Sequence, residues 1–132
     1  MRIMVDANIL ISALLYPEST PAKALRDISA WHKLLLADYI IKELWDVTKR
    51  KFPSKQADLD VLLSKLSFEF VAAPREPSKL ISDPKDAPIL NAAILAEADV
   101  IVSGDRHFLQ LEMDHPRVMT VADYMRLSES IA

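Results

Sequence analysis

The sequence has 132 residues, a length that predicts one domain over residues 1–132. Hydrophobic residues make up 51% of it and charged residues 27%, which excludes a disordered chain. The net charge of −3 gives no overall basic surface for a nucleic acid, and the lack of cysteine excludes disulfides and thiolate metal sites.

The first part of the chain alternates short apolar runs with helical patterns. Residues 2–5 predict a buried strand, although so short an apolar run is ambiguous with a helix. Residues 8–15 predict a helix that Pro17 ends. Ser19 and Thr20 can cap the next helix, which extends to about residue 30.

The middle of the chain repeats this alternation. Residues 33–37 are apolar enough for a strand covered on both faces, and Asp38 can cap the helix that follows, up to Pro53. Another helix starts at Ser54, and residues 68–72 predict a third strand. The expected buried stripe of this second helix is Leu59, Leu62, Leu63 and Leu66.

The last part begins with a segment from 74 to 88 that holds four of the eight prolines and predicts a surface loop. A helix is expected over 86–97, a fourth strand over 99–103, a fifth over 117–121 and a terminal helix over 122–129. Strands that alternate with helices predict an α/β fold, a three-layer α/β/α sandwich with a central parallel sheet of about five short strands.

Two acidic residues follow strands of this predicted sheet. Asp6 ends the first strand, and Asp105 comes after the fourth, separated by Ser103 and Gly104. Ligands of open parallel sheets bind beyond the carboxyl ends of the strands, so both acids would lie at that edge if the two strands are neighbours. Asp6 would then lie at the rim, where burial ends. Gly104 is the only glycine, and Gly104→Val should be damaging if this residue adopts a positive φ at the turn.

Two further acids lie near helix starts. Asp86 begins a predicted helix, and Glu43 lies about one turn into another, beside its apolar stripe. Taken singly, each aspartate also fits a helix cap, and Glu43 also fits a solvated position. Carboxylates that lie close together repel one another unless a cation neutralises them, and Mg²⁺ and Mn²⁺ prefer oxygen ligands. A cluster of these acids would therefore be a metal site.

Four segments in this order resemble the motifs of PIN-domain nucleases, especially the branch of toxins from toxin–antitoxin systems (VapC-like). They are ValAspAlaAsnIleLeuIleSerAlaLeu at the start, GluLeuTrpAspVal around Glu43, AspProLysAspAlaProIleLeuAsnAlaAla, and IleValSerGlyAsp. The resemblance implies a PIN-like fold and an endoribonuclease that uses one or two Mg²⁺ or Mn²⁺ ions to hydrolyse RNA phosphodiester bonds.

The resemblance also implies which residues form the site. The four acids of the family match Asp6, Glu43, Asp86 and Asp105, and Asp83 is a rival for the position of Asp86. Supporting positions match Asn8 and Ser103, whose hydroxyl can orient a metal ligand or a water. Arg106, next to the site, is a candidate RNA contact. The proline after Asp86 departs from the family pattern, although a first helical turn tolerates it.

We expect Asp6, Asp86 and Asp105 to hold the principal ion, and Glu43 to position a second ion or the attacking water. The resemblance also implies a small antitoxin partner and a homodimer. No signal peptide or membrane-spanning stretch is evident, so a cytoplasmic protein without membrane contact is expected.

Other functions compete with this interpretation. A haloacid dehalogenase-type phosphotransferase needs an Asp where this chain has Asn8, and a receiver domain needs adjacent acids that are absent here. A PIN-like fold that only binds as a scaffold, and a PIN nuclease of RNA processing, remain as alternatives.

Overall fold

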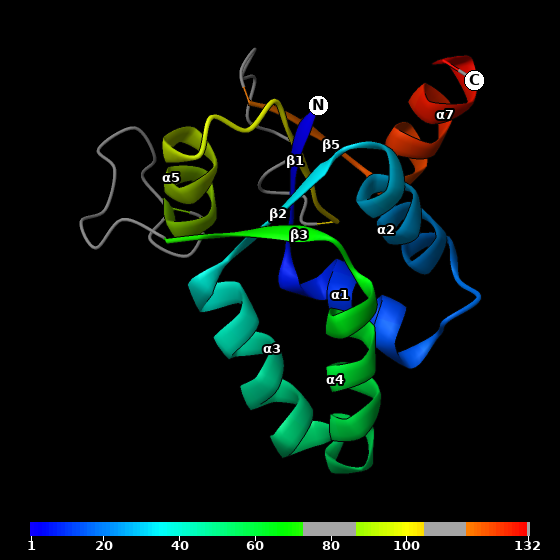
Figure 1. Ribbon diagram of the computed structural model, residues 1–132, viewed down its shortest axis with the longest axis vertical. Helices are drawn as coiled ribbons and strands as arrows, with labels where there is room; N and C mark the ends of the chain where they lie inside the picture. The colour runs from blue at the N-terminus through cyan, green and yellow to red at the C-terminus, as the bar shows by residue number, and fades with distance from the viewer. Residues whose placement is uncertain (73–86, 105–115, 132) are drawn as a thin grey trace.

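The computed structural model describes residues 1–72, 87–104 and 116–131 (Figure 1). The predictions for Asp83, Asp86, Asp105, Arg106 and residues 74–86 of the proline-rich loop lie outside the described residues. The last two residues of that predicted loop, 87 and 88, are helical instead.

Five parallel strands form one sheet in the order β3-β2-β1-β4-β5, which confirms the predicted fold class. Three of the strands are one or two residues shorter than predicted, because their pairing with neighbours stops earlier. The strands are β1 (Arg2–Val5), β2 (Lys33–Ala37), β3 (Phe68–Val71), β4 (Val100–Val102) and β5 (Arg117–Met119).

The register brings the carboxyl ends of the central strands to one edge. Met4 of β1 pairs with Leu35 of β2 on one side and with Ile101 of β4 on the other. The chain builds outward from β1 to β2 and β3, and then returns to add β4 and β5 on the other side of β1. The topological switch point, where ligands of such sheets bind, therefore lies between β1 and β4.

The described part of the chain contains six α-helices and one short 3-10 helix, near the predicted positions. They are α1 (Ala7–Leu15), α2 (Thr20–Trp31), α3 (Asp38–Lys51), η1 (Pro53–Lys55), α4 (Gln56–Lys65), α5 (Ala87–Leu95) and α7 (Val121–Ile131). Figure 1 shows α5 on one side of β3, and α3 and α4 on the other. None of the helices described is long and apolar enough to cross a membrane.

Side chains and helix dipoles fix the starts of the first helices. Asp6 caps α1, accepting a hydrogen bond from the Ile9 amide, and Ser19 caps α2 through the Ala22 amide. The predicted cap at Asp38 is wrong. Ala37 occupies that position without a side-chain hydrogen bond, and Asp38 is the first residue of α3, where the helix dipole favours a carboxylate.

The core lies between the sheet and the helices. In β1 and β2 the residues Ile3, Met4 and 34–37 are fully buried, as the apolar runs predict. The expected stripe of α4 is confirmed in part, because Leu59 and Leu66 are buried while Leu62 and Leu63 are only half-buried. The well-packed centre of the sheet thus supports the edge where β1 and β4 end.

Candidate active site

Asp6 and Ser103 meet at the switch point. Each follows the end of a central strand, and Val5 pairs with Val102 directly before them. The Ser103 hydroxyl donates a hydrogen bond of 2.5 Å to Oδ2 of Asp6. The amide of Asp6 donates a hydrogen bond to the Val102 carbonyl at 3.4 Å. This bond extends the pairing of β1 and β4 as far as Asp6. The expectation that strands one and four are neighbours is confirmed.

Asp6 is more deeply enclosed than the sequence indicated. Its relative exposure is 9% and that of Ser103 is 0%, so the prediction that Asp6 lies where burial ends is wrong. Oδ1 of Asp6 accepts the Ile9 amide at 3.1 Å while Oδ2 accepts Ser103. A buried carboxylate needs such partners, because its charge is otherwise costly to remove from water. The two donors hold the carboxylate in one orientation.

The start of α3 lies beside this pair. The parallel register of β1 and β2 brings the residues after both strands, Asp6 and Asp38, to the same edge of the sheet. Asp38 is half-buried, and its Oδ1 accepts the Tyr39 amide at 2.7 Å. Glu43 follows one turn after Tyr39 and is exposed.

The pKa of the Tyr39 phenol responds to several of these acids. Burial raises the pKa of the Tyr39 phenol, and the charges of Glu43, Asp6 and Asp38 raise that pKa further. The charges of these three carboxylates therefore act on one phenol at this edge. Sequence reasoning missed Tyr39; its signals were its place next to Asp38, which directly follows the second strand, and its spacing of four residues from Glu43.

The other predicted site residues are placed unevenly. Asn8 is exposed in the first turn of α1, next to Asp6 in sequence. The structure brings Asp6 into contact with Ser103, and brings Asp6 and Glu43 within electrostatic reach of the same phenol. Asp86, Asp105 and Arg106 lie outside the described residues.

The carboxylate oxygens at this edge are the type of ligand that a hard cation such as Mg²⁺ prefers. An ionised carboxylate offers about four acceptor positions, so the hydrogen bonds to Asp6 are compatible with a metal ligand. In the ranges that the structure describes, no group of three or more acidic, histidine or cysteine side chains could hold a metal ion. A complete ligand set would therefore need the acids outside these ranges.

The backbone at Gly104 does not adopt a positive φ. The condition under which Gly104→Val should be damaging is therefore not met. A Cβ built on Gly104 meets nothing within 4 Å in the described structure. Neither backbone strain nor a close approach thus explains glycine at this position.

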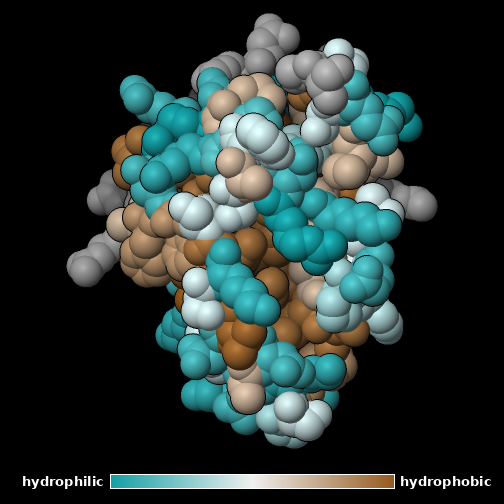
Figure 2. All heavy atoms as spheres, turned by 45° about the vertical axis from the view of Figure 1, so that its right-hand side comes forward, coloured by the Kyte–Doolittle hydropathy of each residue, from teal (hydrophilic) through white to brown (hydrophobic). Residues whose placement is uncertain are grey.

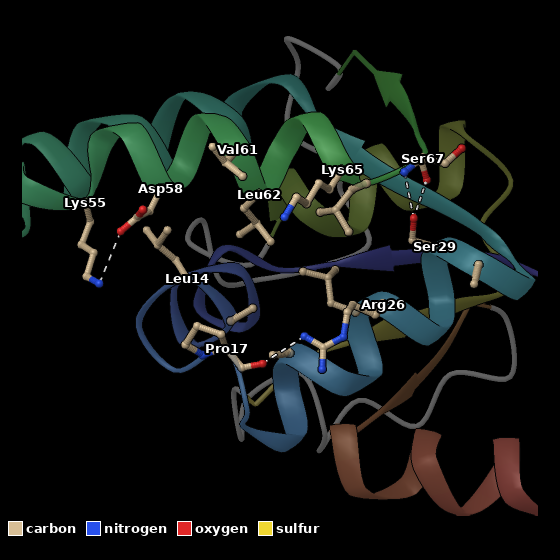
Figure 3. Close-up of a pocket in the computed structure, with 15 residues that line it drawn as sticks. Leu14, Pro17, Arg26, Ser29, Lys55, Asp58, Val61, Leu62, Lys65 and Ser67 are labelled. Atoms are coloured by element: carbon tan, nitrogen blue, oxygen red, sulfur yellow. Dashed lines mark hydrogen bonds and ion pairs between the residues drawn. The ribbon is translucent and has the colours of Figure 1, made fainter.

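A pocket of about 670 Å³ lies away from Asp6, near the opposite end of α1 (Figure 3). Apolar side chains of α1, α2 and α4 form much of its lining, among them Leu14, Leu25 and Leu62. Figure 2 shows hydrophobic side chains in a hollow on this side of the molecule, surrounded by hydrophilic ones. The charged residues that line the pocket are Arg26, Lys55, Asp58 and Lys65.

Comparison with known sequences supports a family assignment. Residues 2–107 match the sequence profile of the PIN domain. No curated protein matches the sequence significantly.

Solved structures with the same fold differ widely in sequence. VapBC2 from Rickettsia felis, crystallised bound to a DNA fragment from its promoter, contains a chain that superposes with a TM-score of 0.70 at 18% identity. The match covers 91% of this chain and 98% of that one. PAE2754 from Pyrobaculum aerophilum superposes with a TM-score of 0.62 at 17% identity, covering 98% of this chain and 90% of that one.

Proposed function

Because the chain belongs to the PIN-domain family, we propose that it is a metal-dependent endoribonuclease and the toxin of a toxin–antitoxin system. The observation that carries the proposal is the contact between Asp6 and Ser103 at the switch point. A buried carboxylate oriented by two donors, at the place where ligands of such sheets bind, is suited to a defined chemical task.

In this proposal Asp6, Asp86, Asp105 and Glu43 hold Mg²⁺ or Mn²⁺. A bound ion of this kind supplies an activated water and neutralises charge on the scissile phosphate. Asp6 is the fixed member of the set, because Ser103 and the start of α1 determine its orientation. Glu43, exposed on α3, is the adjustable member and orients the second ion or the attacking water.

The proposed substrate is RNA. The net charge of −3 does not attract a polyanion, so attraction has to be local. Arg106 remains the proposed phosphate contact, because it follows Asp105 directly in the sequence.

The decisive experiment is cleavage of single-stranded RNA with and without Mg²⁺ or Mn²⁺ by the wild type and by Asp6→Asn. Asparagine is an equally good helix cap, so the variant should fold while losing the charged ligand. We expect divalent-dependent cleavage by the wild type and none by the variant. Absence of both cleavage and metal binding in the wild type would favour a binding module instead.

The pocket supports an antitoxin as the protein partner. Its apolar lining would accept an apolar peptide segment, and Arg26, Lys55 and Lys65 against one Asp58 favour acidic flanks on that segment. We propose that the antitoxin binds there as well as at the active-site groove, and that the nuclease is a homodimer. Size-exclusion chromatography with light scattering tests the dimer directly.

A further inference from the structure

The last turn of α3 carries three basic residues in succession to which the proposed function gives no role. Lys49, Arg50 and Lys51 are all exposed. Cations at this end of a helix interact favourably with the helix dipole, which stabilises the helix but does not use their side chains fully. In the part of the chain that the structure describes, none of the three forms an ion pair. Their charges can therefore bind an anion from outside the chain.

This basic cluster lies on the same helix as the site acid Glu43. Glu43 and Arg50 are seven residues apart, close to two full turns, so both exposed side chains lie on one face of α3. The rise along the helix between them is about 10 Å. Figure 1 shows α3 extending from the end of β2 away from the sheet. The face that carries Glu43 thus leads outward from the sheet edge to the cluster.

We propose that Lys49 and Arg50 bind backbone phosphates of the substrate RNA next to the nucleotides at the scissile bond. This inference rests on the proposed function, because it takes Glu43 as an acid of the site. A protein with a net charge of −3 attracts a polyanion only through local groups of cations. The cluster is such a group, on a face that begins at the site.

The charge along this face of α3 changes sign with distance from the sheet. Glu43 and Asp46 come first, and Lys49 and Arg50 follow. Acids near the reacting phosphate suit a metal ion, whereas phosphates farther along the strand need cations of the protein itself. Phosphate contacts fix the register and orientation of a nucleic acid without reading its sequence. We therefore expect the two residues to contribute to RNA binding and not to the chemical step.

The test is the double variant Lys49→Gln/Arg50→Gln, since glutamine removes the charge and keeps a good helix former. KM for single-stranded RNA should rise while kcat stays unchanged. Two phosphate contacts to a single strand contribute about 1.4 to the slope of log KM against log salt. Between about 50 and 200 mM KCl, at constant Mg²⁺, the KM of the wild type should rise about sevenfold more than that of the variant.

The matched control is Lys23→Gln/Arg117→Gln, which removes the same two charges from exposed positions on α2 and at the start of β5. It should keep the KM and the salt dependence of the wild type. With an active wild type, an unchanged salt dependence in Lys49→Gln/Arg50→Gln, an equal change in the control, or a loss of kcat alone would overturn the inference and leave the proposed function standing. A wild type that cleaves no RNA would overturn both.

Discussion

At the scale of the residue, hydrogen bonds from Ile9 and Ser103 orient the carboxylate of Asp6. A carboxylate with a relative exposure of 9% cannot rely on water, and it receives the Ile9 amide on one oxygen and Ser103 on the other. The same residue thus caps a helix and offers a fixed charge at the sheet edge. The structural and the catalytic interpretation of Asp6 are compatible, since they use different acceptor positions of one group.

Ser103→Ala should separate these two tasks. The variant keeps the cap of α1 but removes one donor from a buried carboxylate, so we expect a loss of about 1 to 3 kcal/mol in the free energy of unfolding. RNA cleavage should fall by about 10- to 100-fold, because Asp6 loses its orientation. Urea unfolding and cleavage rates measure both effects.

Ser64→Ala is the control for this prediction. The Ser64 hydroxyl donates to the Val61 carbonyl one turn earlier in α4 and is exposed, so its loss should change neither quantity measurably. Full activity of Ser103→Ala would mean that Asp6 needs no orientation from β4.

At the scale of the element, a polar cluster joins α7 to α2. The Tyr124 hydroxyl donates to Asp27 at 2.5 Å, and the Ser128 hydroxyl donates to the same carboxylate oxygen at 2.9 Å. His32, directly after α2, packs edge-on against the Tyr124 ring with centroids 6.1 Å apart. Its Nδ1 lies 3.1 Å from the α-amino nitrogen of Met1. The terminal helix is thus attached through a site that contains a histidine.

This site predicts a dependence of stability on pH. Burial lowers the pKa of His32, the nearby α-amino group lowers it further, and Asp27 opposes both. The folded state therefore binds fewer protons than the unfolded state, so the contribution of His32 is complete above about pH 6.5 and is lost as the pH falls through its lowered pKa. Urea unfolding at a series of pH values from 7.5 to about 5 should show the decline.

His32→Gln keeps a polar side chain that does not titrate, and it should make this decline shallower than in the wild type. An identical pH dependence of the two proteins would show that His32 does not contribute.

At the scale of the whole molecule, the order of the strands decides where chemistry can occur. After β1 the chain adds β2 and β3 on one side, and later β4 and β5 on the other. Asp6 and Ser103 follow β1 and β4, the two strands between which this change of side occurs. The pocket between α1, α2 and α4 is a separate surface, suited to a protein segment. The switch point and this pocket thus lie at different ends of α1.

A cation that binds the folded site should stabilise the whole domain by mass action. At an ion concentration one hundred times the Kd, the gain is about 2.7 kcal/mol, which raises the Tm of a domain of this size by roughly 10 °C. We expect this shift on titration with Mn²⁺ in differential scanning calorimetry. Asp6→Asn should show a much smaller shift, and a flat titration of the wild type into the millimolar range would contradict a metal site.

Much of the fold could be predicted from local patterns. The apolar runs at 2–5 and 33–37 became β1 and β2 with the predicted bounds, because strands covered on both faces must be apolar throughout. Prolines and capping residues marked the ends of α1 and the start of α2. Strand ends were less well predicted at β4 and β5, where the limit of pairing depends on the neighbouring strand rather than on the sequence of the strand itself.

The sequence by itself determined that this is an α/β protein and which acids follow its strands. Both depend on local patterns, namely apolar runs that mark buried strands and capping residues that mark helix starts. Only the tertiary structure decided that Asp6 is buried, that Ser103 touches it, and that the charge of Asp6 acts on Tyr39. These relations join residues up to 97 positions apart. They exist because the order of strands in the sheet brings distant chain segments to one edge, and that order is set by packing of the whole domain.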